Sequence, residues 1–190
     1  SFTPVLQYCE NRELRKQLLM DYTTRGNHDN ENDNKRVFIK KYSTDVLPLY
    51  YFTDNNYRSL RLADMLLLYA EVLNEINNGP TQKAIDLVDR VRTRVKLPTL
   101  ADSQYYTDPK ILTDYKEFKE HIKIERGLEL AFECIRWMDL KRWGFTEENV
   151  DELRSRDADF KNFVIGKNER FPLPQIEVDN NPNLTQNPNY

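Results

Sequence analysis

The sequence contains few of the side chains that form disulfides or hold metal ions. Its 190 residues include two cysteines, Cys9 and Cys134, and two histidines, His28 and His121. Neither a CxxC pair nor an HExxH motif is present. We therefore expect no disulfide framework, no metal site and no cofactor, and we expect Cys134 to be a buried small hydrophobe within a helix.

Glycine and long apolar runs are also scarce. Five glycines disfavour a β-sandwich or barrel, which needs many tight turns. The longest apolar run, Met65–Ala70, has six residues, whereas a membrane-spanning helix needs about 20. Charged residues make up 31% of the chain, and aromatic residues, at 12%, supply bulky core material. This composition favours a mostly α-helical globular unit spanning residues 1–190.

The charge balance does not indicate a nucleic-acid partner. Lysine and arginine number 28 against 31 acidic residues, for a net charge of −3. Nucleic-acid-binding proteins usually carry a basic excess or patch. The basic residues between 90 and 96 have helical spacing, and we interpret them as the solvated face of a helix.

The strongest periodicity predicts a helical hairpin over residues 58–98. The stripe expected to face the core in the first helix consists of Leu62, Met65, Leu66, Tyr69, Ala70, Leu73 and Ile76, and that of the second of Ala84, Leu87, Val88, Val91 and Val95. Gly79 suits the left-handed position that ends the first helix, Thr81 can cap the second, and Pro98 follows its end. The hairpin approaches a tetratricopeptide unit, and it must pack on further helices to cover its apolar faces.

A long third helix is predicted over residues 113–144. Nine of the thirteen residues from Leu128 to Leu140 are apolar and lie on all sides of the helix, so it should be buried. Its charges then need partners. The spacing offers four pairs at i, i+3: Arg126 with Glu129, Glu133 with Arg136, Arg136 with Asp139, and Asp139 with Arg142.

The two ends of the chain have less pattern. Residues 1–57 form an irregular, loop-rich start, with a short strand or extended segment near residues 37–39. Four prolines in residues 171–190 argue against regular secondary structure there. We expect an extended tail pinned to the body by Phe171, Leu173, Ile176, Leu184 and Tyr190.

Several blocks of residues together resemble the SusD/RagB family. The helix bearing Glu125-Arg126, Glu129-Leu130, Phe132-Glu133, Arg136-Trp137, Asp139-Leu140 and Arg142-Trp143 is similar to the family signature ER..EL.FE..RW.DL.RW. Arg61-Leu62-Ala63-Asp64 through Glu71 resembles the family helix RLADvlLmyAEaln, and residues 173–188 resemble its closing segment. These blocks occur in the family's order and span about residues 58–190.

The chain departs from the family pattern at a few positions. Asp89 replaces an Asn, and Val95-Lys96 replaces the Ala-Gly that ends the second helix. Cys134 and Asn189 also stand where the family commonly has Gly. Asn tolerates the left-handed backbone that Gly adopts, so the last change is mild.

The resemblance implies a SusD-like helical scaffold and a role in nutrient uptake. It implies the C-terminal portion of a non-catalytic lipoprotein on the bacterial outer membrane, lipid-anchored outside this chain. Such a protein binds an oligosaccharide or other nutrient and delivers it to a SusC-like TonB-dependent transporter. The chain alone is expected to be marginally stable. The motif residues match the scaffold of the family, not a ligand site.

A glycan site needs exposed aromatic faces beside polar groups. Tyr50 and Tyr51 (beside Phe52), and Tyr105 and Tyr106, are the candidates, although the favoured interpretation is that they pin loops to the core, because most aromatic residues are packing residues. Trp137 and Trp143 lie on the motif helix and are rejected as sugar platforms.

Two alternative functions follow from the residues. Glu125, Glu129 and Glu133 share a helix face, which a glycoside hydrolase could use, but nearby arginines give an ordinary ion-pair explanation. A stand-alone tetratricopeptide-like module that binds a protein partner would require several similar hairpins within the chain. The sequence shows only one.

Overall fold

The computed structural model describes residues 20–21, 38–39, 41, 56, 58–103, 108–156 and 158–190. Two short strands, β1 (Met20–Asp21) and β2 (Phe38–Ile39), pair antiparallel with Met20 opposite Ile39. The extended segment predicted near residues 37–39 is therefore confirmed. The rest of the described chain is helical or irregular, which confirms the mostly α-helical class.

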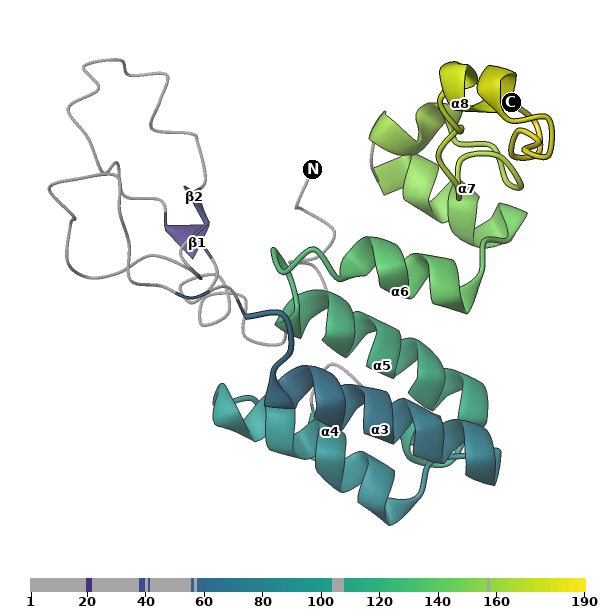
Figure 1. Cartoon of the computed structure of the whole chain (residues 1–190). Helices are drawn as coiled ribbons and strands as arrows, with labels where there is room; N and C mark the ends of the chain where they lie inside the picture. Colours follow the sequence, from purple (N-terminus) through teal and green to yellow (C-terminus); the bar gives the residue numbers. More distant parts are fainter. Residues whose placement is uncertain are drawn as a thin grey trace, which may run out of the picture. The chain divides into compact units, whose positions relative to one another are not determined.

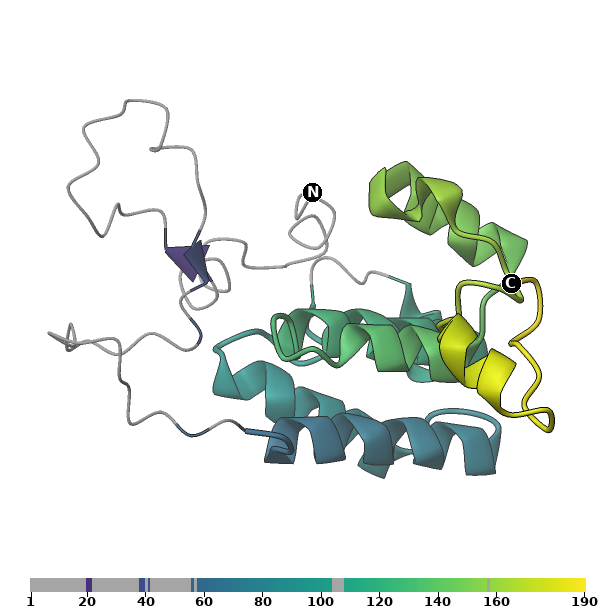
Figure 2. The same ribbon diagram turned by 45° about the horizontal axis from the view of Figure 1, so that its top comes forward.

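The chain divides into two compact units between Ile135 and Arg136, where the sequence predicted a single one. The first unit contains the helices α3 (Leu62–Asn77), α4 (Gln82–Arg94) and α5 (Tyr115–Glu129), and the short 3₁₀ helix η2 (Pro109–Leu112). Figures 1 and 2 show α3 lying beside both α4 and α5, an arrangement that the contacts between these helices support.

The predicted hairpin forms, and local residues explain its turn. Asn78 adopts the left-handed conformation at the end of α3, with φ 49° and ψ 41°, so the prediction that Gly79 would do so is wrong. Asn accepts this conformation at little cost, and its backbone N–H bonds to carbonyls of the last turn. The Thr81 hydroxyl accepts a hydrogen bond from the Ala84 N–H at 3.2 Å, which confirms it as the cap of α4.

The core of the first unit lies between the hairpin and α5. It consists of Ala63, Leu67, Ala70, Ala84, Ile85, Val88, Val91, Leu100, Ile111, Phe118 and Ile122. On α4 the predicted stripe is the buried one, with Ala84 and Val88 fully inaccessible. At the start of α5, the Asp114 carboxylate accepts the N–H groups of Lys116 and Glu117.

On α3 the predicted core stripe is mostly wrong. Leu62, Met65, Tyr69 and Ile76 are exposed, with Leu62 60% and Ile76 75% accessible. The buried face carries Ala63, Leu67 and Ala70 together with the polar Asp64, Glu71 and Asn74. Apolar residues lie on most sides of this helix, so helical spacing alone could not identify the buried face. Contacts between α5 and the polar side chains of α3 determine which face is buried.

The single helix predicted over residues 113–144 is two helices. α5 ends at Glu129, and α6 (Arg136–Trp143) begins after a turn in which Phe132 and Cys134 have φ of 66° and 60°. Two left-handed residues cannot continue an α-helix, which explains the break. Cys134 lies in this turn, so its predicted burial in a helix is wrong, and it is exposed with a free thiol. The prediction of burial on all sides is also wrong, since Met138 is 63% exposed.

The second unit contains α6, α7 (Glu147–Arg156), the 3₁₀ helix η3 (Ala158–Asn162) and α8 (Gln175–Asn180). Four aromatic rings pack together in it: Trp137, Phe145, Phe160 and Phe163, with the Phe145 and Phe163 centroids 4.7 Å apart. This cluster and the fully buried Val150 give the small unit a core of its own.

Hydrogen bonds from side chains hold the tail, and Leu173 and Leu184 are half-buried. The Gln186 side chain accepts a hydrogen bond from the Leu173 N–H at 2.8 Å and donates one to the Leu173 carbonyl at 2.9 Å. Asn187 and the Tyr190 hydroxyl donate to the carbonyls of Phe171 and Arg170.

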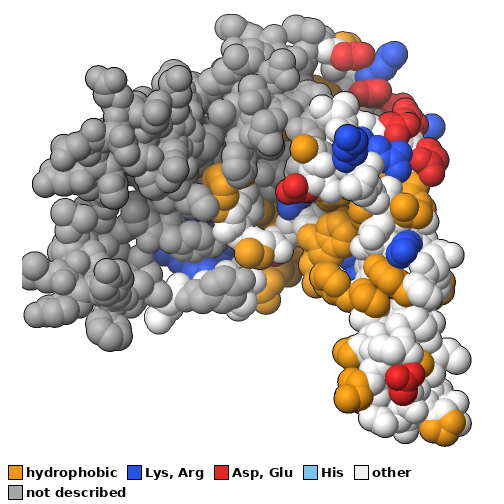
Figure 3. Space-filling view, turned by 90° about the horizontal axis from the view of Figure 1, so that it is seen from above, with side chains coloured by type: hydrophobic (Ala, Val, Ile, Leu, Met, Phe, Trp, Pro, Cys, Tyr) orange, Lys and Arg blue, Asp and Glu red, His pale blue; other side chains and the backbone are white. Residues whose placement is uncertain are grey.

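Two expectations about the tail are wrong. Phe171 is 87% exposed and Ile176 is 65% exposed, so neither pins it. Figure 3 shows hydrophobic side chains reaching the surface of the described part of the chain. The tail also includes the six-residue helix α8, which follows directly after Pro174. Proline is compatible with a helix start, because the N–H groups there have no intrahelical partner.

Candidate functional site

Acidic side chains from α5 and the turn after it each meet basic side chains from other parts of the first unit. Glu125, Glu129 and Glu133 are spaced by four residues and are all buried, at 1%, 7% and 6% exposure. With Lys41, Arg61, Asp64, Arg92, Arg94 and Arg126 they form what we call the interhelical ion-pair network.

The deepest pair of the network joins α4 to α5. The Arg92 guanidinium donates to the Glu125 carboxylate, and both side chains are 1% exposed. His121, one turn earlier on α5, places its Nε2 3.5 Å from the same carboxylate. A charge pair this far from water is tolerated only with well-placed hydrogen bonds, so the pair constrains how α4 and α5 pack.

Glu129 and Glu133 share the guanidinium of Arg61. Arg61 Nη1 lies 2.6 Å from Glu129 Oε1, and Arg61 Nε lies 2.8 Å from Glu133 Oε2. Arg94 reaches Glu129 Oε1 at 2.7 Å, and Lys41 pairs with Glu133. Lys41 Nζ also donates to the backbone carbonyl of Glu129 at 2.7 Å. The residue before α3, the last residue of α4 and the turn after α5 therefore meet at one end of the unit.

The environment of this end shifts three pKa values. Burial alone would raise the pKa of Glu133, but hydrogen bonds from Arg61 and Lys41 outweigh it and hold that pKa below the ordinary 4.5. Burial lowers the pKa of Lys41, and its bond to Glu133 offsets this only in part. Burial opposes the charge of Arg61 as well, but its hydrogen bonds to Glu133 and Glu129 leave its pKa raised.

Another pair of the network joins α3 to α5. Arg126 Nη1 lies 2.8 Å from Asp64 Oδ1, with side-chain exposures of 2% and 7%. Toward the other end of α3, the Asn74 amide donates to the Tyr115 carbonyl at 3.0 Å, and Glu71 is buried on the same side of α3. These contacts explain why the buried face of α3 carries polar side chains among its apolar ones: Asp64 and Asn74 bind α5 through charge and hydrogen bonds.

The predicted ion pairs joined residues three positions apart, whereas most of the observed pairs join residues far apart in the sequence. Asp139 and Arg142 lie 2.8 Å apart, which confirms that pair. Arg126 instead meets Asp64, and Glu133 meets Lys41 and Arg61, from distant positions in the sequence. In the second unit, Arg136 and Arg142 lie over the Trp143 ring, 5.4 Å and 4.7 Å from its centroid.

The interpretation of residues 90–96 as a solvated face is wrong for Arg92. It is 1% exposed, whereas Arg90 and Arg94 are exposed. The sequence held a signal for this, because Arg92 lies four residues after Val88 and so shares the apolar face of α4. Lys41 had no such signal, since its contact with Glu133 joins residues 92 positions apart.

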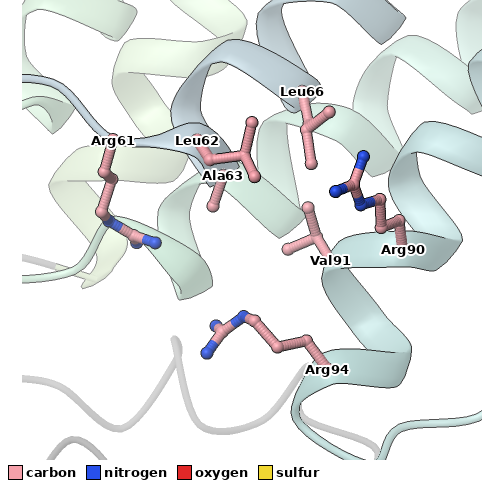
Figure 4. Close-up of a pocket in the computed structure, with 7 residues that line it drawn as sticks. All are labelled: Arg61, Leu62, Ala63, Leu66, Arg90, Val91 and Arg94. Atoms are coloured by element: carbon pink, nitrogen blue, oxygen red, sulfur yellow. The ribbon is translucent and has the colours of Figure 1, made fainter.

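A cavity of about 450 Å³ opens beside Arg61 and Arg94, at the end of the first unit where α3 begins and α4 ends. It is lined by Arg61, Leu62, Ala63, Leu66, Arg90, Val91 and Arg94. Figure 4 shows the Arg61 and Arg94 side chains pointing toward one another from different segments. Aliphatic side chains line it between the arginines. Among the described residues that line the cavity there are guanidinium groups but no aromatic ring on which a sugar could stack.

The carboxylates of the network have a structural explanation. Each of Glu125, Glu129 and Glu133 is paired with a basic group. In a glycoside hydrolase, by contrast, two carboxyl groups flank the substrate, one as the acid and the other as the base or nucleophile. No cluster of side chains suited to a metal ion occurs among the residues that the structure describes. The network therefore fits a role in holding helices together.

The predicted ligand-binding tyrosines cannot be placed on this geometry. Tyr50, Tyr51, Tyr105 and Tyr106 all lie outside the described residues. They remain predictions.

Known proteins resemble this arrangement along nearly the whole chain. The sequence profile of the SusD family matches residues 7–190. A solved SusD homologue from Bacteroides thetaiotaomicron has a similar fold, with a TM-score of 0.70 and 26% identity over 99% of this chain. This chain belongs to the SusD family.

Curated relatives agree, and they are much longer. Two SusD-like proteins of Formosa agariphila are 35% and 36% identical to this chain over 141 and 137 residues, or 73% and 72% of it. The match spans about a quarter of each relative, 26% and 25%, and 43% of the solved homologue. Within the described residues, no helix is both long enough and apolar enough to cross a membrane.

Proposed function

We propose that this chain is part of a non-catalytic surface lipoprotein that captures an oligosaccharide or another nutrient for import. The observation that carries the proposal is the family match over residues 7–190. The described structure is compatible with it: a helical scaffold held by ion pairs, with the acidic residues engaged in those pairs. No cofactor takes part.

The proposal includes a partner and a location. The captured nutrient passes to a SusC-like TonB-dependent transporter in the bacterial outer membrane, and a lipid anchor outside this chain holds the protein at the cell surface. Both statements rest on family membership alone.

The first experiment is glycan-array screening of the complete reading frame, followed by titration calorimetry with each ligand that binds. The expected result is reversible binding with no release of reducing sugar during prolonged incubation. Release of product would contradict the non-catalytic role. Absence of binding to any glycan, together with binding of another nutrient class, would remove oligosaccharide from the proposal.

The tyrosine candidates are tested in the same assay. Replacing Tyr105 and Tyr106 together with Ala should weaken glycan binding if their rings stack on sugar, and the same holds for Tyr50 and Tyr51. Phe171→Ala is the matched control, because Phe171 is an aromatic residue 87% exposed in the second unit. Equal affinity in all variants would assign these tyrosines to loop packing.

The transporter is tested by affinity purification of the tagged complete protein from detergent-solubilised outer membranes. Co-purification of a TonB-dependent β-barrel is expected. Its absence under conditions that preserve other outer-membrane complexes would contradict the proposed partnership.

A further inference from the structure

The turn between α3 and α4 contains a chemically reactive pair of residues. Asn78 and Gly79 form the one Asn-Gly pair in the sequence. Asparagine is a thermolabile side chain, because its amide can be lost as ammonia. Glycine has no side chain to shield its backbone nitrogen, so that nitrogen can reach the amide of the preceding asparagine. The loss of an asparagine amide is therefore chemically easiest at this pair.

Deamidation at such a pair needs no reagent other than water. The Gly79 nitrogen attacks the Asn78 Cγ atom, the bond from Cγ to Nδ2 breaks, and ammonia leaves with the proton of the Gly79 N–H. Water then opens the cyclic imide at either of its carbonyl groups. Opening at Cγ gives Asp, and opening at the main-chain carbonyl gives isoaspartate, in which the backbone is longer by one methylene group.

The Asn78 side chain is available for this reaction. It is exposed, and no hydrogen bond holds its amide to any residue that the structure describes. The two asparagines before it differ. Asn77 donates to the Leu73 carbonyl at 2.7 Å, and Asn74 is fully buried and donates to the Tyr115 carbonyl at 3.0 Å. Of these three asparagines, Asn78 alone combines a free amide with a following glycine.

The fold holds the attacking nitrogen. The Gly79 N–H donates to the Asn74 carbonyl at 3.1 Å, a bond typical of a helix that ends in a left-handed residue. The last turn of α3 is itself tied to α5, because the Tyr115 hydroxyl donates to Glu75 Oε2 at 2.7 Å. The Gly79 nitrogen can attack Asn78 only after its own bond has opened. Helix ends open at a lower free energy than the rest of a domain, so this opening controls the reaction.

We propose that Asn78 is a site of spontaneous deamidation, and that opening of the last turn of α3 sets its rate. The carboxylate that forms lies at the negative end of the helix dipole, and α3 has no basic residue in its last turn to offset it. The modified protein should therefore have a weaker turn between α3 and α4. The change accumulates with the age of the protein and does not depend on the nutrient captured.

The test is incubation of the complete folded protein at neutral and mildly alkaline pH. The tryptic peptide of residues 62–83 carries Asn74, Asn77 and Asn78, so mass spectrometry compares all three in one molecule. An isoaspartyl methyltransferase assay measures the isoaspartate. We expect deamidation at Asn78 to be several-fold faster than at Asn77, to accelerate with pH, and to be faster still in urea. No deamidation of Asn78 in the folded protein would overturn the site, and equal rates with and without urea would overturn the control by the fold.

Gly79→Ala is the variant that tests the chemistry. Gly79 has no positive φ, and a Cβ at this position would meet no atom nearer than the Thr113 carbonyl oxygen, at 3.9 Å. Alanine therefore fits the turn, and the melting temperature should hardly change. Deamidation at Asn78 should be several-fold slower, both in the folded protein and in urea. An unchanged rate would overturn attack by the backbone nitrogen of residue 79.

Glu75→Ala tests the control by helix opening. It removes the acceptor of the Tyr115 hydroxyl and the carboxylate 2.6 Å from Lys119, both of which tie the last turn of α3 to α5. Deamidation at Asn78 should be several-fold faster in the folded protein and unchanged in urea. Glu148→Ala, at an exposed position of α7, is the matched control and should change neither rate. Equal rates in the two folded variants would overturn the role of helix opening.

Discussion

At the scale of single residues, this unit depends on charges that are buried together. Asp64, Glu125 and Arg126 are each less than a tenth exposed, and each has an oppositely charged partner on another helix. Replacing such a pair by apolar residues is often neutral, but removing one member leaves a charge without compensation. The network is therefore most sensitive to single substitutions.

Asp64→Asn should destabilise the protein by about 3–5 kcal/mol, because it removes the carboxylate 2.8 Å from buried Arg126. Urea unfolding followed by circular dichroism measures the change. Asp86→Asn, at an exposed position of α4, is the matched control and should change the free energy of unfolding by less than about 0.5 kcal/mol. Equal losses in the two variants would contradict the buried pair.

Glu133 makes stability depend on pH. Its folded pKa lies below the ordinary value of 4.5, so its contribution is complete above that value and is lost as the pH falls through the folded pKa. The free energy of unfolding should thus decline on acidification below about pH 5, and Glu133→Gln should reduce the slope of that decline. Urea titrations at several pH values provide the comparison. Identical slopes in the parent and the variant would count against the role of Glu133.

At the scale of elements, the sequence predicted which helices exist better than how they face. Spacing and caps located α3 and α4 closely, and Thr81 was identified as a cap. The orientation of α3 could not be derived, because Leu62, Met65 and Leu67 satisfy helical spacing on several sides. The partners of Asp64 and Glu133 lie on other segments, which no local pattern contains.

Backbone conformation explains where the long predicted helix breaks. Lys96, Cys134 and Asn189 have φ of 60°, 60° and 68°, and all three stand where the family pattern has Gly. The side chains of Lys96 and Cys134 make the left-handed conformation costly, whereas Asn tolerates it. The positions at which this chain lacks the family's Gly are therefore positions with a left-handed backbone.

Cys134→Gly and Lys96→Gly should each stabilise the protein by about 1 kcal/mol, by relieving that cost at exposed positions. Asn189→Gly should give no such gain, because Asn tolerates this conformation and its side-chain amide donates to the Gly166 carbonyl at 3.1 Å. The alanine variants at 96 and 134 keep the Cβ and are the controls. Thermal unfolding distinguishes them, and an equal gain with Ala and Gly would show that backbone conformation is not the cause.

At the scale of the whole molecule, the chain is two compact units, and the outer face of α3 is apolar and exposed. Composition predicted the mostly helical class, and the motif blocks predicted the family. The division at Ile135 was not predicted, because the aromatic cluster of the second unit joins Trp137 to Phe145 and Phe163 across a stretch with little helical periodicity.

The 190-residue chain by itself should unfold in urea with an m-value below that of a two-state domain of the same length. The reason is that two separate cores and the exposed apolar face of α3 expose less new surface on unfolding than one continuous core would. Fluorescence of Trp137 and Trp143 reports the second unit, and far-ultraviolet circular dichroism reports all helices. A single coincident transition with the m-value of a 190-residue domain would contradict this expectation.

Glu125 and Glu129, which lie one turn apart on α5, also bear on how the helices align during folding. Sliding α5 by one turn against its neighbours would bring Glu125 to the place of Glu129, so these two charges alone barely distinguish the two alignments. Arg126 does distinguish them, because one turn away in either direction lies Ile122 or Leu130, which would leave Asp64 buried against an apolar side chain. The Asp64–Arg126 pair therefore disfavours packing in which α5 is shifted by one turn.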